Sequence, residues 1–345
     1  MRKPLLIILS LITIHSYGQD GQFSQYFTTN TLINPAFAGI IPEMEFSSNY
    51  KRGGNKEGDN FFELMQATFI YPLKVVTSQE HQVGGIGATF FRESRGFQGI
   101  FTSQKILLSG AYTLKLSTFA NNYLAFGLQG GVVQNKISNE ALMWGSQFNK
   151  FFGFDDTLPG ETINVDPVTY PTFNVGVLYT VYDNENLFVR DKSFIVGLTA
   201  ENLNTPKTGD DQEGEISKNV LFKAFASVKL ELNPRMHLHP SALVLSQSNN
   251  YQFNVGFYLS TMMNSARSNT SVMMHVGSWY RQSDSFIVLS GIQVQQLKLG
   301  VSFDLNSETF TSNEVFVQSN PSFEISLAYT LAPSSKVRKV SNPIF

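Results

Sequence analysis

The chain has 345 residues, with 25 Lys and Arg against 27 Asp and Glu, and its formal net charge of −2 excludes the concentrated basic surface of a nucleic-acid-binding protein. It contains no cysteine, which excludes disulfides and a lipid-modified cysteine. A soluble protein and an outer-membrane barrel both agree with the mean hydropathy of −0.08. The 30 Phe and 13 Tyr, beside only 15% charged residues, favour a barrel, which places aromatic rings at both membrane boundaries.

Residues 1–18 have the pattern of a secretory signal peptide, with two basic residues, an apolar run over 5–14, and Ser16 and Gly18 before a cut at Gln19. The run is too short to cross a bilayer of about 30 Å. We therefore expect cleavage and an exported mature chain. Losing the two basic residues takes the basic count from 25 to 23 against 27 acidic residues, so the mature chain would carry a charge of −4.

Residues 19–42 form a segment without a regular period. Its aromatic residues come early, and Asn34-Pro35 then interrupts the chain, so neither a strand nor a long helix fits throughout. Because aromatic rings need burial, we expect this segment either to plug the sheet that follows or to dock beside it.

From Met44 onward, apolar and polar residues alternate in segments of nine to fifteen residues. Tilted membrane strands need about nine to eleven residues, whereas strands of soluble sheets usually have five or six. The fourteen expected strands are 44–52, 61–73, 83–93, 103–116, 122–134, 172–182, 193–202, 218–232, 235–245, 250–262, 271–281, 285–293, 297–306 and 322–331. An even number leaves both ends in the periplasm. The pattern predicts an all-β transmembrane outer-membrane β-barrel of about 14 antiparallel strands over residues 43–332, with the N-terminal segment outside the barrel strands and a periplasmic tail at 333–345.

The three longest connections, 135–171, 203–217 and 307–321, all fall where a loop on the outer side is expected. The first contains five large rings, which would each gain about 1.5 to 3 kcal/mol from burial. We expect this loop to fold over the barrel mouth or to be covered by a partner. The rings are Trp144, Phe148, Phe151, Phe152 and Phe154.

The carboxylates that follow these rings do not have the spacing of an EF-hand, so a solvated acidic loop is favoured over a calcium site. They are Asp155, Asp156, Glu161 and Asp166. His237 and His239 share one strand face but have no third ligand nearby in sequence. No serine is singled out for a catalytic triad. The sequence therefore favours a protein that is not an enzyme, with no cofactor and no metal.

Several residues are expected where the segment meets the inner wall. Phe23, Tyr26, Phe27 and Phe37 should anchor it against the lumen or the periplasmic rim. The glycine pairs at 84–85 and 130–131 should mark bends or the close approach of a plug. The expected polar lining of the lumen includes Lys223, Lys229, His275, Arg281, Lys298, Asp304 and Glu324.

The N-terminal segment carries a family resemblance. After the signal come Gln19-Asp20, Ser24-Gln25-Tyr26, Asn34-Pro35-Ala36 and Gly39, with Gly21 at the position of a usual proline. This combination is similar to the N-terminal signature of the PorP/SprF family of type IX secretion system outer-membrane proteins of Bacteroidetes. Further strand pieces resemble the family along nearly the whole mature chain. The signature residues expected to hold the plug or docking segment are Phe23, Ser24, Gln25, Tyr26, Phe27, Asn34, Pro35, Phe37 and Gly39.

The resemblance implies a barrel that assists type IX secretion without being an enzyme. It implies export and surface attachment of large adhesins, including those of gliding motility, through the C-terminal domain of the cargo. Implied partners are the secretion machinery, periplasmic peptidoglycan-associated components and the lipid bilayer, with no nucleic acid. A transporter barrel for an apolar solute is the alternative, because barrels with an N-terminal hatch serve that purpose too.

Overall fold

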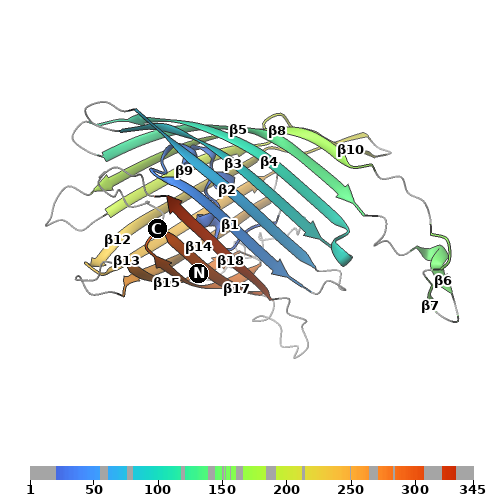
Figure 1. Cartoon of the computed structure of the whole chain (residues 1–345). Coiled ribbons are helices and arrows are strands. Elements are labelled where there is room, and N and C mark those ends of the chain that lie inside the picture. Colours follow the sequence, from blue (N-terminus) through green and yellow to red (C-terminus); the bar gives the residue numbers. More distant parts are fainter. Residues whose placement is uncertain are drawn as a thin grey trace, which may run out of the picture.

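The computed structural model describes residues 21–54, 61–75, 81–117, 121–138, 144–149, 151, 153–155, 157–160, 166–183, 192–211, 214–248, 250–263, 271–282, 284–306 and 321–331. Fourteen antiparallel strands form a closed barrel, in which the first strand pairs with the last (Figure 1). The expected fold class is therefore confirmed. In the described part of the chain, no helix has the length and apolar character needed to cross a membrane.

The barrel strands follow one another around the wall in chain order, and their bounds lie within four residues of those expected from alternation. They are β1 (Met44–Gly53), β2 (Phe62–Val75), β3 (His81–Arg95), β4 (Phe101–Lys115), β5 (Asn121–Ile137), β8 (Val168–Asp183), β9 (Lys192–Glu201), β12 (Leu221–Asn233), β13 (Met236–Gln247), β14 (Asn250–Met262), β15 (Val272–Arg281), β16 (Ser285–Val294), β17 (Leu297–Asn306) and β18 (Ser322–Leu331).

The two ends of the barrel differ in their connections. At one end, which we call the turn end, β1 begins and β18 finishes, and a tight turn joins β16 to β17. The opposite end, called the loop end, carries two small hairpins that the alternation pattern did not predict. One is β6 (Phe148–Asn149) with β7 (Gly153–Phe154), and the other is β10 (Lys207–Asp211) with β11 (Gly214–Ser217). Long connections face outward in outer-membrane barrels, so the loop end is the extracellular one.

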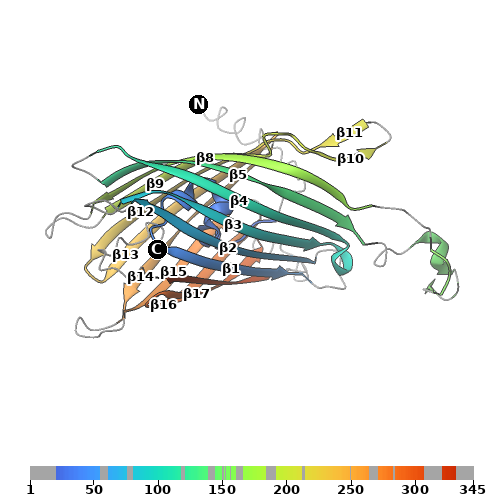
Figure 2. The ribbon, with the colours of Figure 1, turned by 45° about the horizontal axis from the view of Figure 1, so that its top comes forward.

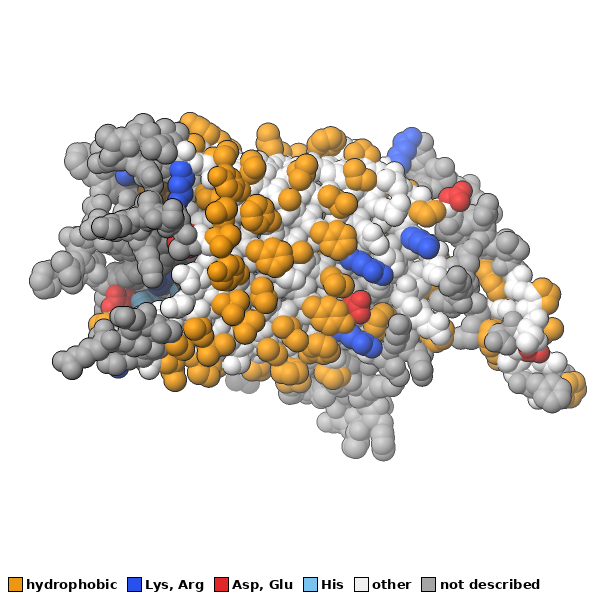
Figure 3. All heavy atoms as spheres, viewed as in Figure 1, with side chains coloured by type: hydrophobic (Ala, Val, Ile, Leu, Met, Phe, Trp, Pro, Cys, Tyr) orange, Lys and Arg blue, Asp and Glu red, His pale blue; other side chains and the backbone are white. Residues whose placement is uncertain are grey.

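The outside of the wall is apolar, and Figure 3 shows these side chains spread over the barrel. Exposed leucine, isoleucine and valine side chains occupy the middle of the strands. Many aromatic side chains lie toward the two ends, although Phe69 and Phe257 are exposed near the middle of their strands. Those toward the turn end are Phe46, Tyr71, Tyr112 and Tyr329, and those toward the loop end are Phe90, Phe173, Phe222, Tyr251, Tyr280 and Phe323. Two belts with an apolar zone between them are the arrangement that a lipid bilayer selects.

The wall is taller on one side of the barrel. Strands β3, β4, β5 and β8 have 15 to 17 residues, whereas β15 to β18 have 10 each. Outward positions at the loop end of the long strands are polar, for example Gln104, Gln134, Lys136 and Thr169. A lipid-facing surface would be apolar there, so these strand ends project beyond the bilayer.

The described part of the N-terminal segment, from residue 21 on, lies inside the barrel (Figure 2). It contains three short turns, η1 (Tyr26–Thr28), α2 (Asn30–Ile33) and η2 (Pro35–Gly39). At the loop end Gly21 N donates to Glu93 Oε1, and at the turn end Ile41 O accepts from Gln82 Nε2 at 2.9 Å. We call residues 21–41 the plug segment. Of the two expected placements, lumen or periplasmic rim, the structure has the lumen.

Candidate functional site

Four rings hold the plug segment against the inner wall. Phe27 stacks on Trp279 of β15 with ring centroids 5.1 Å apart, and Phe37 packs against Phe225 of β12 at 5.2 Å. Phe23 meets Phe91 of β3 edge to face at 6.1 Å. All four residues expected as anchors lie against the wall: Tyr26, Phe27 and Phe37 meet the neighbouring strands β12 to β15, whereas Phe23 meets β3.

Tyr26, the fourth ring, is buried but keeps its hydroxyl paired. The hydroxyl lies 2.7 Å from Ser241 Oγ of β13, which also accepts from the Trp279 indole N–H. The residue therefore combines apolar packing with one fixed polar contact.

Asn34-Pro35 sets the direction of the second half of the plug segment. Asn34 caps η2 by accepting from Ala36 N at 2.9 Å, and Pro35 occupies the first turn, where its missing N–H costs nothing. The same amide donates through Nδ2 to Val177 O of β8 and Leu198 O of β9, each at 3.0 Å. One side chain thus fixes the local turn and ties it to two wall strands.

The inner wall has glycines, which lack a side chain, where the plug segment comes closest to it. A Cβ at Gly127 would overlap the backbone of Ala36, one at Gly176 would overlap the Asn34 side chain, and one at Gly85 would overlap Ala38 O. Gly127 and Gly176 face each other across β5 and β8. The expected close approach therefore occurs at Gly85, whereas the pair at 130–131 contacts neighbouring strands instead.

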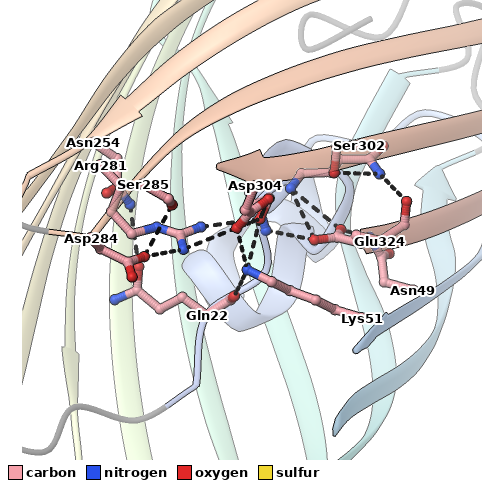
Figure 4. A network of polar contacts seen from close by, with 12 residues as sticks. Gln22, Asn49, Lys51, Asn254, Arg281, Asp284, Ser285, Ser302, Asp304 and Glu324 are labelled. Atoms are coloured by element: carbon pink, nitrogen blue, oxygen red, sulfur yellow. Dashed lines mark hydrogen bonds and ion pairs between the residues drawn. The ribbon is translucent and has the colours of Figure 1, made fainter. Parts of the chain in front are cut away.

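Ser24 and Gln25 enter a buried polar network on the opposite wall, which Figure 4 shows. Ser24 Oγ donates to Asp304 of β17 at 2.6 Å and accepts from Lys51 Nζ of β1 at 2.7 Å and from Arg281 of β15 at 3.2 Å. Lys51 also donates to Asp304 at 2.7 Å. We call Ser24, Gln25, Lys51, Arg281, Asp304 and Glu324 the Ser24 cluster.

Glu324 of β18 completes the cluster by binding the backbone of the plug segment. It accepts from Ser24 N at 2.6 Å and from the side chain of Asn49 at 2.8 Å. Gln25 Oε1 accepts from Ser326 Oγ at 2.7 Å. The two basic and two acidic side chains of the cluster are all buried, and Arg281 also pairs with the more exposed Asp284 at 2.6 Å. Removing Asp304 would therefore leave the buried Lys51 without its ion-pair partner.

A cavity lies above the plug segment at the loop end. Its volume is about 1130 Å³, part of which is open to solvent. The plug segment forms the floor through residues such as Phe23, Leu32 and Ile33, and the barrel forms the walls. We call it the vestibule. The rest of its lining is Gly21, Gln22, Tyr26, Thr29, Phe91, Lys105, Leu107, Val133, Thr172, Asn174, Glu201, Asn202, Lys218, Leu221, Lys223, Leu243, Leu245, Gln247, Asn250 and Gln252.

The aromatic loop does not fold over this opening. Its β6–β7 hairpin stands beyond the loop end of the barrel in both ribbon views (Figures 1 and 2). Phe148 is 67% exposed, Phe151 85% and Phe154 40%, and Trp144 is half-buried. We expected the loop either to fold over the barrel mouth or to be covered by a partner. For the described residues the first expectation is wrong, and the second stays a prediction. Phe152 lies outside the described residues.

The acidic positions after the rings are only partly described. Asp155 accepts from the backbone and hydroxyl of Thr157 at 3.0 and 2.6 Å, which holds the pKa of its carboxyl below the usual value. Asp166 is exposed, whereas Asp156 and Glu161 lie outside the described residues. The hydrogen bonds of Asp155 close a turn of the hairpin loop.

The remaining lumen residues divide by location. Lys223 donates to Leu32 O of the plug segment at 2.6 Å, and Lys298 lines a smaller cavity below Gln25 and Phe27, whereas Lys229 is buried nearer the turn end. The rings of His237 and His239 lie 6.4 Å apart. Within the described ranges, no three His, Cys, Asp or Glu side chains are grouped closely enough to hold a metal ion.

Sequence reasoning missed Lys51, Asn49, Gly127 and Gly176 as partners of the plug segment. Alternation marks the inward face of each strand but not which inward residues meet the segment. The available signal was a basic residue at an inward position of β1 and of β15, Lys51 and Arg281, opposite in charge to the inward Asp304 of β17 and Glu324 of β18.

Comparison with solved structures finds barrels of low sequence identity. A FadL homologue of Pseudomonas aeruginosa has a TM-score of 0.44 and 12% identity, with 88% of this chain and 94% of that chain covered. The CymD monoaromatic hydrocarbon channel has a TM-score of 0.45 and 8% identity over 88% and 92%. The translocator domain of the autotransporter NalP from Neisseria meningitidis has a TM-score of 0.40 and 11% identity, with 83% of this chain and 87% of that chain covered. At such TM-scores these likenesses carry no argument about function.

No curated protein matches the chain in sequence. A family model does match, and it covers residues 15–329, which includes the plug segment and nearly all of the barrel. The description of that family is "Type IX secretion system membrane protein PorP/SprF". With a closed barrel, two aromatic belts and a match along most of its length, this chain belongs to the PorP/SprF family of type IX secretion system membrane proteins.

Proposed function

We propose that this chain is a non-enzymatic outer-membrane component of the type IX secretion system that assists export and surface attachment of large adhesins. It does so by binding the C-terminal domain of the cargo at the loop end. The observation that carries this proposal is the exposure of Phe148 and Phe151 on a hairpin beyond the barrel. Rings exposed to this degree in water are typical of protein-binding surfaces.

In this proposal the cargo does not cross the membrane through this barrel. Fourteen strands enclose a lumen wider than the eight-stranded barrels that side chains fill alone. The plug segment occupies that lumen and is tied to the wall through Asn34 on one side and the Ser24 cluster on the other. The turn end then faces the periplasmic machinery and peptidoglycan-associated components, after export of the chain through a cleaved signal peptide.

The test uses a bacterium that naturally produces the protein. The gene is deleted and complemented with the wild type, with the double variant F148S/F151S, or with S146A, a change at an exposed residue of the same hairpin that removes no ring. We expect deletion and the double variant to reduce adhesin at the cell surface, whereas S146A behaves as the wild type. Unchanged secretion and retention of adhesin after deletion would contradict the proposal.

Affinity purification from membranes identifies the partners in the same strains. We expect the cargo to be recovered with the wild type and lost with the double variant, while the periplasmic components remain in both. Equal recovery of cargo with the double variant would place cargo binding elsewhere on the protein.

A second candidate is an outer-membrane transporter for an apolar solute, and the apolar lining of the vestibule favours it. Flux of a hydrocarbon such as toluene into liposomes that contain the purified protein would support this function. Flux no faster than into empty liposomes would exclude it.

A further inference from the structure

The vestibule has an apolar lower part. Phe23, Leu32 and Ile33 form its floor, and the side chains of Leu243 and Leu245 on β13 form part of its wall. Leu243 is almost fully buried, so its side chain faces into the barrel rather than toward the lipid. Burying apolar groups of a ligand here would be favourable by about 25 cal/mol per Å².

The charges around the vestibule are mainly positive. Among the described residues that line it are three lysines, Lys105, Lys218 and Lys223, and one carboxylate, Glu201, a difference of two positive charges. Lys223 forms an ion pair with Glu201, and Lys105 lies 5.1 Å from the centre of the Phe91 ring. The whole chain has a net charge of −2, so this excess of positive charge belongs to the site and not to the surface in general.

In the described part of the chain, the barrel wall bounds the vestibule laterally and the plug segment bounds it below. The barrel is closed, because each of its strands pairs with two neighbours, and the plug segment covers the lower side. The β6–β7 hairpin, which we call the aromatic hairpin, lies in the connection between β5 and β8. These two strands contribute Val133, Thr172 and Asn174 to the wall of the vestibule. An occupant therefore enters from outside and can continue onto the hairpin.

We propose that the vestibule binds an extended polypeptide segment that has apolar side chains and carboxylates, as a site separate from the aromatic hairpin. The apolar side chains insert between the plug segment and β13, and the carboxylates bind the ammonium groups of Lys105 and Lys218. This inference rests on the proposed function, which supplies a polypeptide partner at the loop end. A small anionic amphiphile could also bind to these apolar and basic side chains, but it would be too short to reach the exposed rings of the aromatic hairpin.

Binding is measured with the full-length mature protein in lipid nanodiscs, which avoids competition by detergent. The probe is a short fluorescent peptide of alternating leucine and glutamate, and the comparison peptide has lysine in place of glutamate. We expect the acidic peptide to bind and the basic one not to bind. The double variant K105E/K218E should weaken binding of the acidic peptide at least about tenfold, because charged hydrogen bonds contribute about 1.5–3 kcal/mol each.

The matched control is K136E, which makes the same charge change on the outer face of β5, away from the vestibule. It should leave peptide binding unchanged. Because the chain has no cysteine, a single substitution Q247C allows an environment-sensitive dye at the rim of the vestibule. The emission of that dye should shift when the acidic peptide is added. Equal binding of both peptides, no loss in K105E/K218E, or an equal loss in K136E would overturn the inference.

An amphiphile is tested in the same nanodiscs with laurate as the competitor. If laurate binds and the acidic peptide does not, the vestibule is a lipid or solute site and the inference fails. In cells, K105E/K218E should reduce adhesin at the surface while the protein is still inserted. If the gene deletion has this effect and the double variant does not, the vestibule inference is wrong and the proposed function stands; if deletion has no effect, the proposed function itself fails.

Discussion

At the scale of single residues, Ser24 joins the plug segment to four barrel strands. Its hydroxyl donates to Asp304 and accepts from Lys51 and Arg281, while its backbone N–H donates to Glu324. Only a small side chain with a rotating hydroxyl can meet a carboxylate and two cations in so narrow a space. Buried charges of this kind contribute mainly through the cost of breaking the set.

Asp304→Asn tests that cost. The change keeps the shape of the side chain but leaves Lys51 and Arg281 with one carboxylate fewer, and we expect a loss of about 3 kcal/mol in the free energy of unfolding. Urea unfolding of the barrel in lipid vesicles, followed by Trp fluorescence, measures it. Asp166→Asn, at an exposed loop position, is the control and should change stability by less than about 0.5 kcal/mol. Equal stability of the two variants would show that the cluster does not hold the barrel together.

Gly127→Val tests the close approach of the plug segment to the wall. The new side chain would overlap Ala36, so the second half of the segment has to leave its seat. We expect trypsin or a thiol reagent to reach the segment in this variant and not in the wild type. Gly110→Val adds the same side chain to the outer face of β4, where nothing lies within 4 Å, and should behave as the wild type. If the segment is protected in both variants, Gly127 is not needed for the plug segment to lie against the wall.

At the scale of elements, the plug segment depends entirely on the barrel. Its helical turns contain three to five residues each, far below the length at which a helix is stable in water. Carbonyl groups at the end of α2 are satisfied by the wall: Ile33 O accepts from Thr199 at 2.9 Å and Leu32 O accepts from Lys223. The segment therefore takes its conformation from the lumen that it fills.

Alternation could predict the barrel elements because each strand has lipid on one side and a polar lumen on the other. The signal fades at the loop end of β5 and β8, where the polar Gln134, Lys136 and Thr169 face water instead of lipid, and there the expected strands stop three or four residues early. Contacts such as Ser24 with Asp304 join residues 280 positions apart. No local pattern carries such pairs, since they exist only after the barrel closes.

A disulfide between T31C and T89C tests the placement of the plug segment directly. The two hydroxyls lie 2.7 Å apart, one on α2 and the other on the inner face of β3, and the chain has no cysteine to interfere. We expect the bond to form during purification in air, with mass spectrometry of the linked peptides as the measurement. T31C with T169C, whose second position is on the outer face of β8, should stay reduced. Absence of the bond in the first pair would mean that the segment does not rest on β3.

At the scale of the whole molecule, the barrel combines a lumen that holds the plug segment with an asymmetric outer surface. The tall side at β3 to β8 carries the aromatic hairpin, whereas the low side at β15 to β18 carries the Ser24 cluster that fixes the plug segment. The Ser24 cluster and the aromatic hairpin therefore lie on different sides of the barrel. The tall side also holds the second half of the plug segment, through Asn34 on β8 and the close approach of Ala36 to Gly127 on β5. A partner bound at the hairpin would therefore lie on the same side as these plug contacts.

Ion conductance in a planar bilayer tests the seal. The wild-type protein should show no steady conductance, and a variant that lacks residues 21–41 should conduct continuously, because a fourteen-stranded lumen without its plug is wide enough for water and ions. Faster migration on a gel before heating than after it shows that the shortened chain still forms a compact barrel. Gly127→Val should conduct intermittently if the segment is only displaced. The T31C/T89C variant should show no conductance either as the disulfide or after the disulfide is reduced. Steady conductance by the wild type, or none by a folded barrel without the segment, would mean that the plug segment does not seal the lumen, and its buried contacts would then serve only the stability of the wall.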